Sequence, residues 1–192
     1  MKQFLIGLIL ALVESPPPLF AHSKMLEGEK RVDVSTHTDH IRLIDEQGHK
    51  IDGKFFKDKH SILFFGFTQC SDICPIGMKA LEKALIEEPP RIPFQVIFVS
   101  IDSKRDKPEK LRKFLSRYKG PFKGVTGEWS EIYKFYSLFV HGDAALVTER
   151  LNHSRLLYVI GPDGKLDGHT DSEASTGEIR RRLTSLTQTE NP

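Results

Sequence analysis

The stretch Phe64-Phe65-Gly66-Phe67-Thr68-Gln69-Cys70-Ser71-Asp72-Ile73-Cys74-Pro75 contains the only two cysteines of this 192-residue chain. The residues that lead into it, 61–65, are apolar enough for a buried strand, and a helical pattern of apolar residues follows it. Two thiols separated by three residues at a strand-to-helix turn can hold a soft metal ion or cycle between dithiol and disulfide. These two chemistries make different demands on the rest of the chain.

Predicted strands and helices alternate on both sides of the cysteine stretch. Residues 61–67 and 95–101 are continuous apolar runs, which are typical of central strands covered on both faces. The other predicted elements are a hairpin over 41–52, helices over 75–88, 108–119, 129–140 and 176–186, a short strand over 122–127, and a closing hairpin over 155–167. This order, with a cysteine pair at the end of the first central strand, predicts the α/β class and a thioredoxin-like fold, in which helices flank a central mixed sheet preceded by an N-terminal hairpin.

The first 21 residues have the pattern of a secretory signal peptide. Lys2 precedes an apolar run over 4–13, and three prolines and a cleavage-like Leu19-Phe20-Ala21 follow. Ten apolar residues are too few for a bilayer-spanning helix, which needs about 20. We therefore expect a signal peptide over 1–21, a flexible leader over 22–40 and one domain over 41–188. The alternative is that 1–21 is retained as an anchor in the inner membrane. In either case the domain is expected in the periplasm.

Composition narrows the classes of function. The chain is 39% hydrophobic and 28% charged with a net charge of +2, so it is long enough for one core and gives no reason to expect nucleic-acid binding. In an oxidising compartment two cysteines would normally form a structural disulfide. A bridge that closes so short a loop removes little chain entropy. The pair is therefore predicted to perform chemistry rather than to staple the fold.

The position of Cys74 predicts a reactive sulfur. It lies at or next to a helix N-terminus, whose N–H groups favour a negative charge, so its thiol is expected to titrate below a free cysteine. This feature suits both metal binding and disulfide exchange. The spacing is more informative, because thioredoxin-type redox pairs have two intervening residues and this pair has three. The wider loop lets both sulfurs face one ion, and two thiolates select soft metals such as Cu(I).

His153 is the predicted third ligand. It stands at the end of a long loop, immediately before the strand predicted over 155–160. In a thioredoxin-like fold this junction lies beside the cysteine loop and carries a cis-proline, yet no proline occurs here between Pro121 and Pro162. A histidine at this junction could complete a site of two sulfurs and one nitrogen. Met78, one helical turn after Cys74, is read as core filler rather than as a further soft ligand.

The cysteine stretch resembles the signature of the Sco/SenC (PrrC) copper proteins. Further matches, in order along residues 41–186, are Val99-Ser100-Ile101-Asp102, Arg105-Asp106, Gly124-Val125-Thr126-Gly127, His153-Ser154, Tyr158-Val159-Ile160 and Gly161-Pro162-Asp163-Gly164. The resemblance implies a thioredoxin-like domain that binds one copper ion, Cu(I) or Cu(II), through Cys70, Cys74 and His153. Two positions depart from the family pattern, because Gln69 and Ser71 stand where members commonly have His and Pro.

The resemblance further implies a part in assembling the copper centre in subunit II of cytochrome c oxidase. The leading hypothesis is therefore a periplasmic copper chaperone without enzymatic turnover, which delivers copper to that subunit or to another copper-accepting protein. The alternative is a thiol–disulfide oxidoreductase in which Cys70 and Cys74 reduce a partner's cysteines and His153 is dispensable. A periplasmic thiol reductant or a copper donor would be a further partner.

Overall fold

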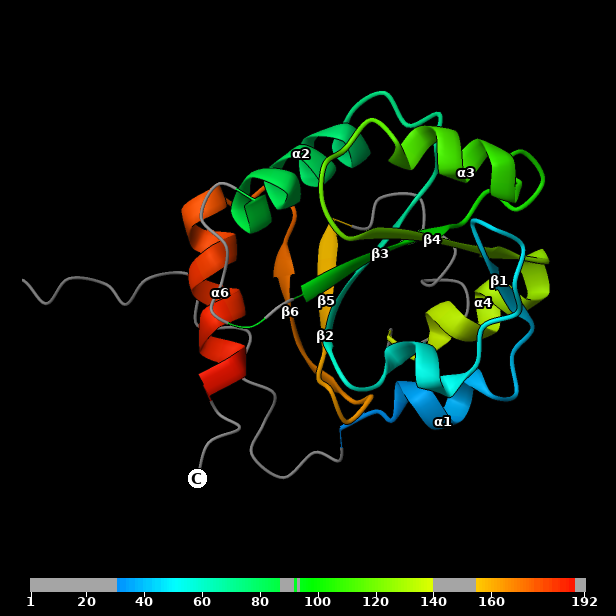
Figure 1. The fold of residues 1–192 in the computed structure, drawn as a ribbon, viewed down its shortest axis with the longest axis horizontal. Helices are drawn as coiled ribbons and strands as arrows, with labels where there is room; N and C mark the ends of the chain where they lie inside the picture. The colour runs from blue at the N-terminus through cyan, green and yellow to red at the C-terminus, as the bar shows by residue number, and fades with distance from the viewer. Residues whose placement is uncertain (1–30, 87–91, 93, 140–154, 189–192) are drawn as a thin grey trace, which may run out of the picture.

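The computed structural model describes residues 31–86, 92, 94–139 and 155–188 (Figure 1). Six strands and the helices that flank them make up this part of the chain. In chain order they are α1 (Val34–Thr38), β1 (Leu43–Asp45), the 3-10 helix η1 (Gly53–Phe56), β2 (His60–Gly66), α2 (Ile73–Ile86), β3 (Phe94–Ser100), α3 (Pro108–Leu115), β4 (Phe122–Gly127), α4 (Trp129–Ser137), β5 (Leu156–Ile160), β6 (Leu166–Asp171) and α6 (Thr176–Gln188). Among the described residues, no helix is both long and apolar enough to cross a bilayer.

The strands form one mixed sheet in the order β1-β4-β3-β2-β5-β6. The central strands β2, β3 and β4 are parallel, and the outer pairings with β1, β5 and β6 are antiparallel. The predicted α/β class and thioredoxin-like fold are confirmed. Because β2 and β3 are parallel, Gly66 lies opposite Ser100 at the carboxyl ends of both strands. The loops that follow these two strands therefore emerge side by side.

Side chains alternate between the two faces of the sheet. On β2, Ile62 and Phe64 pack beneath α2, α3 and α6, whereas Leu63 and Phe65 pack on the opposite side against α1, η1 and α4. Figure 1 shows α2 and α3 on one side of the strands and α1 and α4 on the other. We call these sides the α2 face and the α4 face. Both are closed by buried apolar side chains, so the sheet lies between two hydrophobic layers.

The packed domain starts earlier than the pattern predicts. The sequence predicts a flexible leader through residue 40, but residues 34–38 form α1 and Val34 is fully buried. Asp33 caps this helix by accepting a hydrogen bond from the Thr36 backbone N–H at 2.9 Å. Arg31 forms an ion pair with Asp163 in the turn before β6. Residues 31–40 are therefore tied to the domain by an ion pair, a buried apolar side chain and a backbone hydrogen bond from Ser35 to Gly164.

Two element boundaries also differ from the prediction. The predicted N-terminal hairpin has its turn, but the return arm is a single bridge between Ile44 and Lys50, and β1 takes β4 as its main partner. Helix α2 begins at Ile73 rather than at Pro75. Cys74 is therefore inside the first turn of α2, and Cys70 precedes the helix. This shift of two residues decides which sulfur meets the N–H groups at the start of the helix.

Candidate metal centre

The cysteine loop, residues 67–72, connects β2 to α2 at the carboxyl edge of the sheet. Its first part is a turn in which the Cys70 N–H donates to the Phe67 carbonyl at 3.1 Å. Cys70 is partly exposed, whereas the Cys74 side chain is packed beneath α2 and only 4% exposed. Both are free thiols. One sulfur is therefore accessible from outside and the other belongs to the core.

Gly66 makes room for the buried sulfur. The alternation along β2 directs position 66 toward the α2 face, and a Cβ atom there would lie 2.6 Å from Cys74 Sγ and 2.8 Å from Phe98 Cε2. Any residue other than glycine would therefore displace the sulfur or the ring. The chain uses the last position of β2 to let the Cys74 sulfur lie against the strand.

Cys70 is the more acidic thiol. Its partial burial opposes ionisation, but backbone N–H groups of Cys74, Asp72 and Ile73 donate to its sulfur and, with the Cys74 thiol, hold the pKa of Cys70 below its usual value. These groups belong to the start of α2, where peptide N–H groups have no partner within the helix. The start of helix α2 thus stabilises a thiolate on Cys70, which lies three residues before the helix.

Cys74 behaves in the opposite way. Burial raises the pKa of Cys74 to about 12, and its hydrogen bond to Cys70 and the negative charges of Cys70 and Asp106 act in the same direction. A Phe67 N–H opposes the rise without cancelling it. The expectation of a more acidic Cys74 is wrong, because burial beneath α2 outweighs the effect of the helix N-terminus on the pKa of Cys74. The helix N-terminus serves Cys70 instead.

A second segment of the chain supports the cysteine loop. Asp106, in the connection between β3 and α3, is fully buried, and its carboxylate accepts hydrogen bonds from both the backbone N–H and the hydroxyl of Thr68. The sequence pattern indicates only a charged loop over 102–107. The only sequence feature that singles out Asp106 is that Arg105-Asp106 matches the pattern of the Sco/SenC family. No local periodicity connects Asp106 to Thr68, which lies 38 residues away.

The predicted third ligand, His153, lies outside the described residues. The chain resumes at Arg155, and β5 then runs antiparallel to β2 with Leu157 opposite Phe64. The start of β5 therefore lies beside the carboxyl end of β2. Among residues that the structure describes, no group of three or more His, Cys, Asp and Glu side chains could hold a metal ion. The described part of the centre is the cysteine pair.

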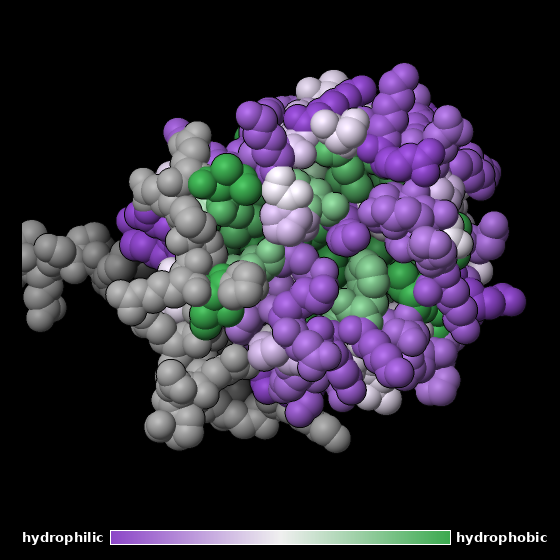
Figure 2. Space-filling view, viewed as in Figure 1, coloured by the Kyte–Doolittle hydropathy of each residue, from purple (hydrophilic) through white to green (hydrophobic). Residues whose placement is uncertain are grey.

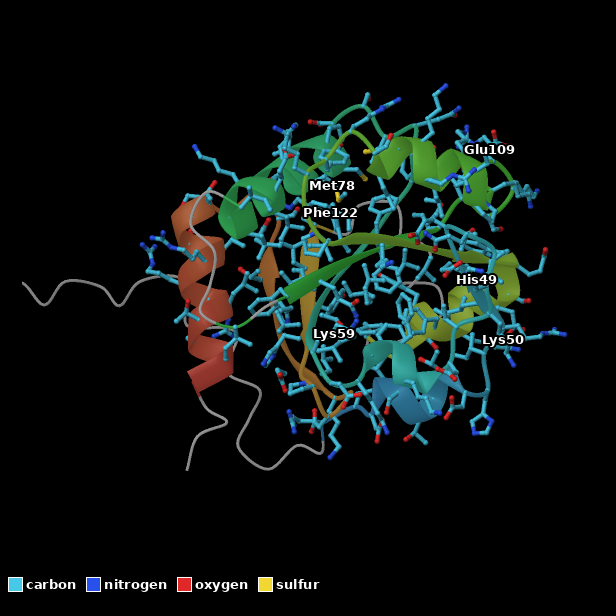
Figure 3. All side chains as sticks on the ribbon, in the orientation of Figure 1. His49, Lys50, Lys59, Met78, Glu109 and Phe122 are labelled. Atoms are coloured by element: carbon cyan, nitrogen blue, oxygen red, sulfur yellow. The ribbon has the colours of Figure 1, made fainter. Side chains whose placement is uncertain are left out.

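Met78 is a core residue, as its helical spacing predicts. Its side chain is fully buried beneath α2, and Figure 3 shows it directed from the helix toward the sheet. It packs in the same apolar layer as Ile62, Phe64 and Cys74. Nothing in this environment sets its thioether apart from an ordinary buried side chain.

The family model described as SCO1/SenC matches residues 30–188. The chain belongs to this family. A relative, the SCO2-like protein of Rickettsia felis, is 30% identical over 183 residues, which cover 92% of this chain and 87% of the relative. The match begins at residue 30, just before the segment that the structure packs against β6.

Solved structures of family members share the fold. Yeast Sco1 with copper bound superposes with a TM-score of 0.67 at 24% identity, covering 79% of this chain and 92% of the yeast chain. BsSco is described as a member of the Sco family of cytochrome c oxidase assembly proteins with a disulfide switch. It has a TM-score of 0.59 at 25% identity, covering 78% of this chain and 92% of its own.

Proposed function

We propose that this Sco-family protein is a periplasmic copper chaperone that holds one copper ion through Cys70, Cys74 and His153. The observation that carries the proposal is the contact between the two thiols, with one sulfur surrounded by backbone N–H groups that favour its thiolate. A thiolate is the species that binds metal, and two sulfurs select a soft ion such as Cu(I). The positive charge of a bound copper ion would also offset the free-energy cost of ionising the buried Cys74 thiol.

The reach of the chain supports His153 as the third ligand. Two residues of extended chain span at most about 7 Å, so His153 stays close to Arg155 at the start of β5. In the β2–β5 register, continuing one pair at a time from Phe64 and Leu157 brings Arg155 level with Gly66. Gly66 is the residue against which the Cys74 sulfur packs. An imidazole is a suitable ligand for copper beside two thiolates.

Delivery to cytochrome c oxidase is the destination that family membership favours. BsSco is described as belonging to a family of cytochrome c oxidase assembly proteins, and yeast Sco1 and a Bradyrhizobium japonicum protein were each solved with copper bound. We infer that this chain delivers copper to the copper centre in subunit II of the oxidase. Export by residues 1–21 would place it in the periplasm, where the signal is either cleaved or kept as an anchor.

A second function has an observation of its own. An accessible, acidic Cys70 next to a buried Cys74 is the arrangement of an attacking and a resolving thiol. A thiol–disulfide oxidoreductase with this pair would reduce the cysteines of a partner by exchange. Such an activity needs both sulfurs but not His153, which separates it from copper transport.

The deciding experiment is a Cu(I) titration of the fully reduced protein in the presence of a competing chelator. We expect one ion per chain, and the loss of tight binding in Cys70→Ser, Cys74→Ser and His153→Ala. His49→Ala is the matched control, because His49 is an exposed turn residue paired with Asp45. Retention of one tightly bound ion by all three site variants would contradict the proposal. If only His153→Ala retained tight binding together with disulfide exchange, the oxidoreductase would be favoured.

Export has a separate test. Expression in a bacterium, followed by fractionation and mass spectrometry of the protein's N-terminus, should find the chain in the periplasm with residues 1–21 removed. An intact N-terminus in the membrane fraction would favour the retained anchor.

A further inference from the structure

We propose that Asp106 is a positioning residue that holds the cysteine loop in the geometry needed for two sulfurs to act on one ion. The inference rests on the copper site proposed above and adds a residue that does not touch the ion. Its basis is a buried contact between the loop that follows β3 and the loop that follows β2. Hydrogen bonds from Thr68 to the Asp106 side chain connect these two loops at the carboxyl edge of the sheet.

The Asp106 carboxylate is fully committed to this contact. Oδ2 accepts hydrogen bonds from the Thr68 backbone N–H at 2.7 Å and from Ser100 Oγ at 2.8 Å, and Oδ1 accepts one from Thr68 Oγ at 2.6 Å. Lys110 Nζ lies 3.3 Å from Oδ1. A carboxylate with no exposed surface is costly unless its oxygens are satisfied, and here three hydrogen bonds and a cation satisfy them.

Thr68 transmits this contact to Cys70. The two residues belong to one turn, which the hydrogen bond from the Cys70 N–H to the Phe67 carbonyl closes. Ser100, the third partner, is the residue opposite Gly66 on the neighbouring strand. The carboxylate therefore connects the end of β3 to the turn that carries Cys70. A shift of this turn would move the Cys70 sulfur away from the N–H groups of α2.

Burial and hydrogen bonding alone do not separate a positioning residue from an ordinary structural one, but the place of the contact does. Glu46 provides the comparison: it is also buried, and it accepts a hydrogen bond from the Gly124 backbone N–H at 2.8 Å, but it supports β4. Loss of either carboxylate should lower stability. Only the loss of Asp106 should change how the two sulfurs work together.

The experiment compares four variants in two assays, with thermal unfolding measured for each. Asp106→Asn keeps the volume and removes the charge, and Thr68→Val keeps the backbone hydrogen bond and removes the hydroxyl. Thr68→Ser restores the hydroxyl, and Glu46→Gln is the matched carboxylate-to-amide control. The first assay is Cu(I) affinity by chelator competition. The second contains no metal: Cys70 and Cys74 give two electrons and two protons to oxidised glutathione, forming their disulfide and two molecules of glutathione, and the equilibrium constant is measured.

We expect Asp106→Asn and Thr68→Val to bind Cu(I) about 10- to 100-fold more weakly, the range typical for groups that orient metal ligands. We expect Thr68→Val, which changes no charge, to shift the glutathione equilibrium toward the dithiol by about 10-fold, because a loose turn brings the sulfurs together less often. Thr68→Ser should stay within about 3-fold of wild type in both assays. Glu46→Gln should match wild type in both, even if it unfolds at a lower temperature.

Failure of the two proposals can be told apart. If wild type binds Cu(I) tightly and both Asp106→Asn and Thr68→Val match it in both assays, the positioning role is overturned whatever their unfolding temperatures. If wild type does not bind Cu(I) but Thr68→Val still shifts the glutathione equilibrium, the copper site fails and the positioning role stands. If Asp106→Asn does not fold, Thr68→Val decides, because it retains the buried carboxylate and the backbone hydrogen bond.

Discussion

The two faces of the sheet are filled in different ways, although the same strands line both. On the α4 face, Phe65 is surrounded by the rings of Phe135, Tyr136, Phe139 and Tyr158, with centroids 4.7–6.1 Å away. On the α2 face, the next residue of β2 has no side chain, and the space beside it holds the Cys74 sulfur. Both faces are closed by apolar side chains, but at the end of β2 the α4 face is filled by large rings and the α2 face makes room for a sulfur.

Reactive polar groups gather at one edge of the α2 face. The carboxyl edge on the α2 side carries the thiol pair, the Asp106 carboxylate and its hydroxyl partners. At the surface, Figure 2 shows purple side chains over the region of α3, whereas α2 exposes the apolar Ile76 and Ile86. Beside the end of β2, the α4 face therefore holds packed rings, while the α2 face holds the Cys74 sulfur and lies next to the Asp106 carboxylate. Substitutions on the two faces should therefore have separable effects on stability and on the chemistry of the thiols.

The largest expected effect is a difference in reactivity between the cysteines. With a pKa of about 12, Cys74 would be ionised in about one molecule in 10,000 at pH 8, whereas Cys70 has a pKa below its usual value. Iodoacetamide should label Cys70 about 100-fold or more faster in the reduced, metal-free protein, as measured by peptide mass spectrometry. Equal labelling rates for the two sulfurs at pH 8 would contradict the assignment.

A methyl group at position 66 should disturb the α2 face next most strongly. Gly66→Ala places a Cβ 2.6 Å from Cys74 Sγ, so we expect a loss of about 1–3 kcal/mol in unfolding free energy together with weaker Cu(I) binding. Gly177→Ala is the control, because nothing lies within 4 Å of a Cβ there. Chemical denaturation and chelator competition measure the two effects. Wild-type copper affinity in Gly66→Ala would show that the close approach is not required.

The matching change on the α4 face should affect stability alone. Phe135 contacts the rings of Phe56, Phe65 and Phe139, so Phe135→Leu should lower the unfolding free energy by about 1–2 kcal/mol. Because these rings do not touch either sulfur, the ratio of labelling rates and the copper affinity should equal those of wild type. A shift in the labelling ratio as large as that of Gly66→Ala would mean that the faces are not independent.

The smallest effect concerns acid stability on the α4 face. The Arg42 backbone N–H and the Lys134 ammonium group lower the pKa of Glu131 to about 2. A carboxylate whose pKa is lower when folded stabilises the protein above its unfolded pKa of 4.5, and this stability is lost as the pH falls from 4.5 toward 2. Glu131→Gln should therefore unfold at a lower temperature than wild type at pH 7, and the gap should close by pH 2. Glu109→Gln is the control, because the Glu109 side chain is exposed on α3 (Figure 3), and it should unfold at the temperature of wild type at both pH values.

The sequence predicts the elements that are long and periodic. The apolar runs predicted over 61–67 and 95–101 correspond to β2 and β3, each shifted by one residue. Helix α1 is missed because five residues are too few for a helical period, and its cap at Asp33 looks like any polar loop residue. Local patterns thus predict the layers of the fold but not the short helix that packs on the α4 face.

In the site, too, the features with a local sequence pattern are predicted and the others are not. The cysteine pair is evident from its spacing alone. The reactivity of each sulfur also depends on where α2 begins, and the helix begins at Ile73, two residues before the start that Pro75 suggests. The contact between Asp106 and Thr68 joins residues 38 positions apart and arises only when β2 and β3 become neighbours. His153 stays a prediction based on chain order and family resemblance.

The most direct test of the copper site is X-ray absorption spectroscopy of the protein loaded with one Cu(I) per chain. We expect an ion with two sulfur neighbours and one nitrogen neighbour. At the high protein concentration of this measurement, His153→Ala should still take up copper weakly through Cys70 and Cys74, so we expect its spectrum to keep the sulfur signals and lose the nitrogen signal. A spectrum with sulfur neighbours alone in wild type, unchanged by His153→Ala, would contradict the proposed copper site.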